Sequence, residues 1–213
     1  MKSVSSKLLI AFIAIAAAAS AIAVWKLHSD KPRLPPAELE SVILSEPHAL
    51  QPFTLTDHEG KPLTLESLKG HWTLLFFGYT HCPDICPTTL SVLKGVFQKL
   101  DSDPELTTTT RTLFVSVDPK RDTPEQLKQY IAYFNPAFIA ATGTRNEIDN
   151  LTTQVGAVYM FEGNTSRDDY IVNHSATILL IDPQGRFYAR FNPPHTASGI
   201  ADIYRRIRAF HDH

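Results

Sequence analysis

The sequence predicts an α/β domain with a central, mainly parallel sheet flanked by helices, an extra N-terminal β-hairpin, and an N-terminal transmembrane anchor. Three observations predict this fold class. Nearly continuous apolar runs of strand length, such as residues 73–79, indicate strands buried on both faces. Segments with helical apolar spacing alternate with these runs, an order that is typical of a parallel sheet covered by helices. Finally, residues 8–25 are apolar and carry no charge.

The apolar segment 8–25 predicts a membrane anchor. As a helix it would rise about 27 Å, close to the hydrocarbon thickness of a bilayer. Lys2 and Lys7 precede it, which favours an N-terminus in the cytoplasm and export of the rest of the chain. A cleaved signal peptide is the alternative, because residues 19–21 (Ala-Ser-Ala) resemble a cleavage site. Either interpretation places the folded domain on the periplasmic side of the inner membrane.

Composition and prolines predict the domain organisation. We expect an anchor or signal at 1–27, a Pro-rich tether at 28–45, and one folded domain at 46–213. The net charge is −2 and the sequence pI is about 6.5. The chain has no basic excess, so a nucleic-acid partner is not expected.

The first half of the domain predicts a hairpin, two buried strands and a helix. Residues 53–65 alternate apolar and polar side chains around Gly60, which indicates the hairpin. Residues 73–79 and 111–118 are the buried strands. A helix follows the first of them, with apolar side chains at positions 90, 93, 97 and 100.

The second half predicts three helices with strands between them. Capping-box patterns at 123–126 and 144–147 each start a helix, the first ending near residue 134. The strands and the last helix are expected at 138–142, 170–181, 186–191 and 200–210. Since sites in such sheets lie beyond the carboxyl ends of the strands, we expect one near residues 80–86.

The chain has two cysteines, Cys82 and Cys86, and three uses for them are open. A structural disulfide would close a loop of about five residues and stabilise the domain by roughly 2 kcal/mol, a small gain for a domain of this size. Pro87 fits best as the first helical residue. Both sulfurs would then lie near the positive end of the helix, where thiolates are favoured as nucleophiles and as soft-metal ligands.

The spacing of the cysteines favours a metal over a redox couple. Three residues separate them, whereas thioredoxin-like oxidoreductases use two, and the wider spacing lets the sulfurs splay around an ion. Two thiolates suit Cu(I), and an added imidazole suits Cu(II) or zinc as well. His81 adjoins Cys82, and His174 interrupts an apolar strand, but spacing alone does not choose between these histidines.

Three blocks of the sequence form a recognisable pattern: FGYTHCPDICP at 77–87, SVDPKRDTP at 116–124, and YIVNHSATILLIDPQG at 170–185. Together they resemble the Sco (SenC) family of thioredoxin-fold copper proteins. The resemblance runs in order from about residue 50 to 208 and implies a thioredoxin-like fold. It also implies that Cys82 and Cys86 bind copper, as Cu(I) or Cu(II), together with a third ligand.

That third ligand, by the same resemblance, is His174. Many family members carry Asp immediately before this histidine, and this chain has Asn173, which puts in doubt a carboxylate that orients the imidazole. Asp118, Asp84 and His81 are the candidates for residues that surround the ligands.

The resemblance further implies a metallochaperone that helps to assemble the binuclear copper centre of cytochrome c oxidase subunit II. Its partners would be that subunit or another copper-receiving protein, and a chaperone that donates copper. No enzymatic activity is required for this role. The alternatives are a thiol–disulfide reductase that keeps the target cysteines reduced, and a redox sensor; both would use Cys82 and Cys86.

Overall fold

The computed structural model describes residues 6–29, 34–167 and 169–212. The chain forms two compact units, Met1–Pro35 and Pro36–His213. Helix α1 (Ser6–Ser29) belongs to the first unit. Among the described residues, no helix is both long and apolar enough to cross a membrane. The predicted anchor therefore lacks structural support and stays a prediction; Lys2 lies outside the described residues.

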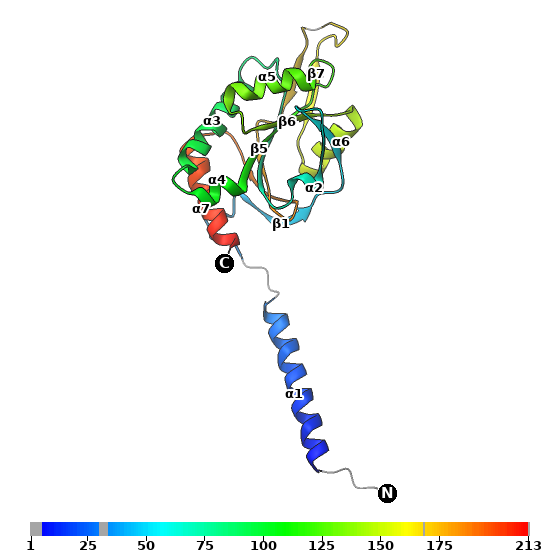
Figure 1. The fold of residues 1–213 in the computed structure, drawn as a ribbon, viewed down its shortest axis with the longest axis vertical. Helices are drawn as coiled ribbons and strands as arrows, with labels where there is room; N and C mark the ends of the chain where they lie inside the picture. The colour runs from blue at the N-terminus through cyan, green and yellow to red at the C-terminus, as the bar shows by residue number, and fades with distance from the viewer. Residues whose placement is uncertain (1–5, 30–33, 168, 213) are drawn as a thin grey trace. The chain divides into compact units, whose positions relative to one another are not determined.

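The second unit contains the strands and the remaining helices (Figure 1). Its strands are β1 (Ile43–Ala49), β2 (Thr54–Asp57), β3 (Pro62–Thr64), β4 (Trp72–Gly78), β5 (Thr110–Ser116), β6 (Ile139–Thr142), β7 (Tyr159–Glu162), β8 (Ile171–His174), β9 (Ile178–Ile181) and β10 (Arg186–Phe191). Its helices are α2 (Leu65–Leu68), α3 (Ile85–Leu100), α4 (Pro104–Thr109), α5 (Pro124–Phe134), α6 (Arg145–Val155) and α7 (Ala197–His211).

The main sheet is mixed, which corrects the prediction of a mainly parallel one. Its strand order is β1-β10-β9-β4-β5-β6-β2-β3. Only the pairs β4–β5 and β5–β6 are parallel. The predicted hairpin β2–β3 and the pair β9–β10 are joined by short turns, and strands joined in this way must run antiparallel.

Strand β4 lies at the centre of the sheet, as its apolar run predicts. All seven of its residues are buried, and it pairs with β5 on one side and β9 on the other. Figure 1 shows α3 and α7 on one side of the strands and α6 on the other. Because β4 is packed on both faces, the position of its last residue, Gly78, is fixed. The turn that carries Cys82 starts from this fixed point.

The predicted strand 170–181 is wrong in one respect, because it is two strands in two sheets. Strand β9 joins the main sheet, while β8 pairs with β7 in a separate two-stranded sheet. The break falls at Ser175, whose N–H donates to the carbonyl of Val158 at 2.9 Å. This short sheet holds His174 at the end of β8, beside the end of β4.

Candidate metal centre

The two cysteines and one histidine converge at the carboxyl end of β4. Cys82 lies in the turn after β4, Cys86 lies in the first turn of α3, and His174 ends β8. Their ligand atoms all lie within 4.8 Å of one another. Within the described part of the chain, this is the one group of three His, Cys, Asp or Glu residues close enough to hold a metal ion.

Helix α3 begins at Ile85, two residues before the predicted start at Pro87. Proline is tolerated there because the first-turn N–H groups of a helix have no intrahelical partner. The capping residue Asp84 makes no side-chain cap bond. Instead, the Cys86 N–H donates to Cys82 Sγ at 3.4 Å. The Cys82 sulfur therefore accepts a hydrogen bond that a capping oxygen accepts in other helices.

A glycine at the end of β4 makes room for the second sulfur. A Cβ atom on Gly78 would lie 2.6 Å from Cys86 Sγ and 2.8 Å from a ring carbon of Phe114. Cys86 is fully buried, and its sulfur therefore packs directly on the β4 backbone. This role of Gly78 was not predicted, although a glycine that ends a buried apolar strand is a signal that another group approaches the backbone closely.

The two thiols differ in acidity because they share one hydrogen bond. The Cys86 thiol donates to Cys82, and this bond, helped by the backbone N–H groups of Cys86 and Asp84, lowers the pKa of Cys82 to about 4. The same bond, and then burial, raise the pKa of Cys86 far above its usual value. Without metal, the pair therefore holds one thiolate and one thiol, and a metal that binds both sulfurs must displace the Cys86 proton.

This asymmetry predicts the pH dependence of alkylation in the reduced, metal-free protein. Because the pKa of Cys82 is lowered, its reactive thiolate persists from neutral pH down to the range of about 4 and is lost below it. We expect one adduct per native chain, on Cys82, at a rate that is nearly constant between pH 5 and 8. Iodoacetamide kinetics followed by mass spectrometry measure this. A rate that falls tenfold per pH unit below 8, as for an ordinary thiol, would contradict it.

The imidazole of His174 is oriented by a backbone carbonyl. Its Nδ1–H donates to the carbonyl of Ser175 at 3.1 Å, so Nε2 is the ring nitrogen that is available to a metal, and it lies 3.1 Å from Cys86 Sγ. The Asn173 side chain is exposed and donates to Glu162 at 2.9 Å. Successive side chains of a strand point to opposite faces, so the side chain at position 173 does not orient this ring.

The three other candidates lie around the site with partners of their own. Asp118 is buried and accepts hydrogen bonds from Arg121 and from the Tyr170 hydroxyl at 2.6 Å. Asp84 is exposed and borders the hollow beside Cys82. The His81 ring lies 3.1 Å from the Thr80 hydroxyl. Their roles toward a metal stay predictions.

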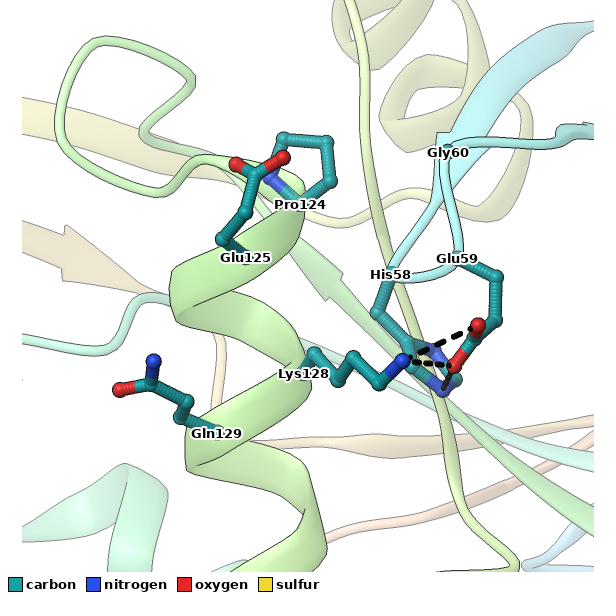
Figure 2. A pocket seen from close by; sticks show the side chains of 7 residues that line it. All are labelled: His58, Glu59, Gly60, Pro124, Glu125, Lys128 and Gln129. Carbon is teal, nitrogen blue, oxygen red and sulfur yellow. Dashed lines mark hydrogen bonds and ion pairs between the residues drawn. The ribbon is translucent and has the colours of Figure 1, made fainter.

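The candidate centre opens into a hollow of about 260 Å³ between the cysteine turn and β8. Another hollow, of about 370 Å³, lies between the β2–β3 turn and α5 (Figure 2). There Glu59 is paired with Lys128 at 2.9 Å, and the His58 Nδ1 accepts the Ala140 N–H at 3.1 Å. The polar side chains of this second hollow already have partners within the protein. We therefore place the candidate metal site at the first hollow, beside Cys82.

This fold and site define a thioredoxin-like α/β domain with a candidate metal centre built on a cysteine pair. The SCO1/SenC family model matches residues 43–209, and the chain belongs to that family. Protein SCO2, mitochondrial, of Saccharomyces cerevisiae is 40% identical over 165 residues, which cover 75% of this chain and 53% of the yeast protein. The match thus spans about half the length of that relative.

Solved structures agree with the fold. The crystal structure of Arabidopsis thaliana ScoI with copper bound is 34% identical, with a TM-score of 0.68, and covers 75% of this chain and 98% of that one. BsSco, described as a member of the Sco family of cytochrome c oxidase assembly proteins with a disulfide switch, is 26% identical, with a TM-score of 0.59. The match to BsSco covers 76% of this chain and 96% of that one.

Proposed function

We propose that this protein binds copper through Cys82, Cys86 and His174 and delivers it to cytochrome c oxidase subunit II during assembly of the binuclear copper centre. The observation that carries the proposal is the convergence of two sulfurs and one imidazole nitrogen within 4.8 Å. Soft thiolates with one imidazole suit both Cu(I) and Cu(II). The copper-bound ScoI structure and the oxidase-assembly description of BsSco support the cargo and the target.

Substitution of the histidine tests the three-ligand site. In His174→Ala we expect the affinity for Cu(II) to fall by more than about tenfold, since even residues that only orient ligands contribute that much. Two thiolates would still hold Cu(I). Titration of the reduced protein, followed by Cu(II) absorption and competition with a chelator, measures both. His48→Ala is the control, because His48 is exposed on β1. Unchanged Cu(II) affinity and spectrum in His174→Ala would overturn the site.

Exposed apolar side chains around the centre support transfer to another protein. In the second unit, the described large apolar side chains that are exposed are Ile85, Tyr133, Val158, Met160 and Ile171. Ile85 and Ile171 border the hollow at the metal centre. Met160 lies opposite Asn173 in the β7–β8 sheet, and Val158 bonds to Ser175, next to His174. We call these four side chains, Ile85, Val158, Met160 and Ile171, the apolar rim. A receiving protein whose own ligands reach the copper must cover this rim.

The rim predicts that two substitutions slow transfer without weakening copper binding. In the double variant Ile85→Ser, Ile171→Ser we expect transfer to the purified copper domain of oxidase subunit II to slow by about tenfold, as for loss of an apolar contact at an interface. Transfer to a small chelator should be unchanged. Tyr133→Ser removes a side chain that is 82% exposed but lies outside the rim, and is the control. Equal rates of copper transfer to that domain for the wild type, the double variant and Tyr133→Ser would contradict the prediction.

A thiol–disulfide reductase is the second candidate function, and the asymmetry of the cysteines favours it. Cys82 would attack a target disulfide, releasing one target thiolate and forming a mixed disulfide. Cys86 would then attack Cys82, releasing the second target thiol and leaving Cys82 and Cys86 oxidised. This reaction needs no imidazole ligand, so His174→Ala should retain it. In cells that lack this protein, rescue of oxidase activity by added copper alone would favour delivery over reduction.

The proposed location is the outer face of the inner membrane, with α1 as a single-pass anchor. The apolar segment 8–25 between Lys7 and the Pro-rich tether supports this location. A tethered domain would search for its partner along the membrane surface only. Membrane fractionation and protease accessibility in spheroplasts test the location; a cytoplasmic protein would overturn it.

A further inference from the structure

A buried carboxylate holds the turn that leads to Cys82. The Asp122 side chain has no exposed surface. Its Oδ2 accepts the N–H of Thr80 at 2.9 Å, and its Oδ1 accepts the Thr80 hydroxyl at 2.6 Å. The Ser116 hydroxyl also donates to Oδ2. One carboxylate therefore binds the backbone and the side chain of a single residue, two positions before a candidate ligand.

Asp122 is itself fixed on both sides in the sequence. Its N–H donates to the carbonyl of Asp118 at 3.0 Å, which closes the turn after β5. The next residue, Thr123, caps α5 by accepting the Gln126 N–H. Because β5 and β4 are paired along their whole length, this turn and the end of β4 form one rigid frame.

The position of Thr80 determines where the Cys82 sulfur lies. The Cys82 N–H donates to the carbonyl of Tyr79 at 3.3 Å, so residues 79–82 form one tight turn. A rotation of this turn would move Cys82 Sγ away from Cys86 and His174. Burying a charged carboxylate is costly unless donors satisfy it. Thr80 and Ser116 supply the donors that offset this cost, so the turn is bound to a carboxylate in a fixed position.

We propose that Asp122 is a positioning residue of the metal centre: by binding Thr80 through its N–H and its hydroxyl, it keeps Cys82 Sγ in place to share a metal with Cys86 and His174. The inference rests on the proposed copper-binding function. It assigns to Asp122 the role of positioning the turn, separate from the neighbouring pair of Asp118 and Arg121.

Two substitutions separate positioning from charge. Asp122→Ala removes both hydrogen bonds from Thr80, which we call the Thr80 clamp. Asp122→Asn retains it, because the amide oxygen can accept the Thr80 N–H while the Thr80 hydroxyl turns to accept from the amide nitrogen. The control is Asp182→Ala. Asp182 is equally buried and accepts the N–H groups of Gln184 and Arg186, but it lies at the opposite edge of the sheet, after β9.

Copper binding is the first measurement. In Asp122→Ala we expect the copper affinity to fall by about 10–100-fold, the usual effect of losing a residue that orients a metal ligand, and the Cu(II) absorption spectrum to change. Asp122→Asn and Asp182→Ala should keep the wild-type spectrum. Wild-type affinity and spectrum in Asp122→Ala would overturn the inference. So would an equal loss in Asp122→Asn, which would assign the effect to charge.

Amide hydrogen exchange of the metal-free protein is the second measurement. We expect faster exchange at Thr80 and Cys82 in Asp122→Ala, and wild-type exchange there in Asp182→Ala. If Asp122→Ala does not fold, Thr80→Val removes only the hydroxyl bond, and its copper affinity should lie below that of the wild type. An unchanged affinity in that variant would overturn the inference. If the wild-type protein bound no copper, the proposed function would fail, while exchange would still test the clamp.

Discussion

Replacement of Gly78 by alanine should lower copper affinity by about 10–100-fold, the range seen when a metal ligand loses its positioning. The added Cβ would lie 2.6 Å from Cys86 Sγ and 2.8 Å from Phe114, so one of these side chains must move. Phe114 and Cys86 are both fully buried, and a sulfur atom is a smaller group to displace than a phenyl ring, so we expect the Cys86 sulfur to shift. Copper titration of the reduced variant, followed by the Cu(II) spectrum, measures the loss.

The control for Gly78→Ala is a second glycine with an equally close contact. A Cβ on Gly95 would lie 2.8 Å from the Cβ of Ala197, where α3 packs against α7. Overpacking costs about 1–3 kcal/mol of stability, partly offset at Gly95 by the higher helix propensity of alanine. Gly95→Ala should therefore lose stability and keep its copper affinity. A similar loss of affinity in both variants would show that Gly78 acts through general stability.

Elements with strong local signals could be predicted from the sequence. The helix α5 begins at Pro124 behind its capping residue Thr123, as the capping-box pattern predicts. The same holds for α6 behind Thr144. Strand β4 is also predicted correctly, because a long apolar run bounded by polar residues has few other stable places in an α/β domain.

The division between β8 and β9 could not be predicted, because it depends on pairing between distant segments. Residues 170–181 have the pattern of one apolar strand with a short polar interruption, and the division into two sheets depends on the pairing of β7 with β8. The roles of Gly78 and Asp122 also depend on contacts between segments that are distant in the sequence. A strand-end glycine and an aspartate before a capping threonine are common, and the fold alone places one on Cys86 and the other on Thr80.

The candidate ligands, too, could be predicted from local sequence only in part. Proline and spacing placed the cysteines at a helix start and favoured a metal, but left His81 and His174 open. The family resemblance selected His174, and the structure brings that residue to the cysteines through the two-stranded sheet. His81 instead lies beside Thr80 and Asp122, with its Nδ1 3.1 Å from the Thr80 hydroxyl and 3.7 Å from Asp122 Oδ1.

Asp118→Ala should destabilise the protein by about 3–5 kcal/mol, because it removes one partner of a buried ion pair. Both members of the pair are buried, and the Arg121 side chain also lies over the ring of Tyr170, at 3.6 Å from its centroid. Without the carboxylate, the guanidinium keeps its contacts to Tyr170 but loses its ion pair with Asp118. Urea denaturation of the metal-free, reduced protein measures the change in the free energy of unfolding.

Copper binding distinguishes this structural role of Asp118 from a role at the metal. The carboxylate oxygens of Asp118 accept from Arg121 and Tyr170, whereas the Asp122 carboxylate binds the cysteine turn. We therefore expect folded Asp118→Ala to bind one copper ion with an affinity within a few-fold of the wild type. A loss as large as that expected for Asp122→Ala, measured at a temperature where both variants are folded, would place Asp118 in the metal centre and contradict this division of roles.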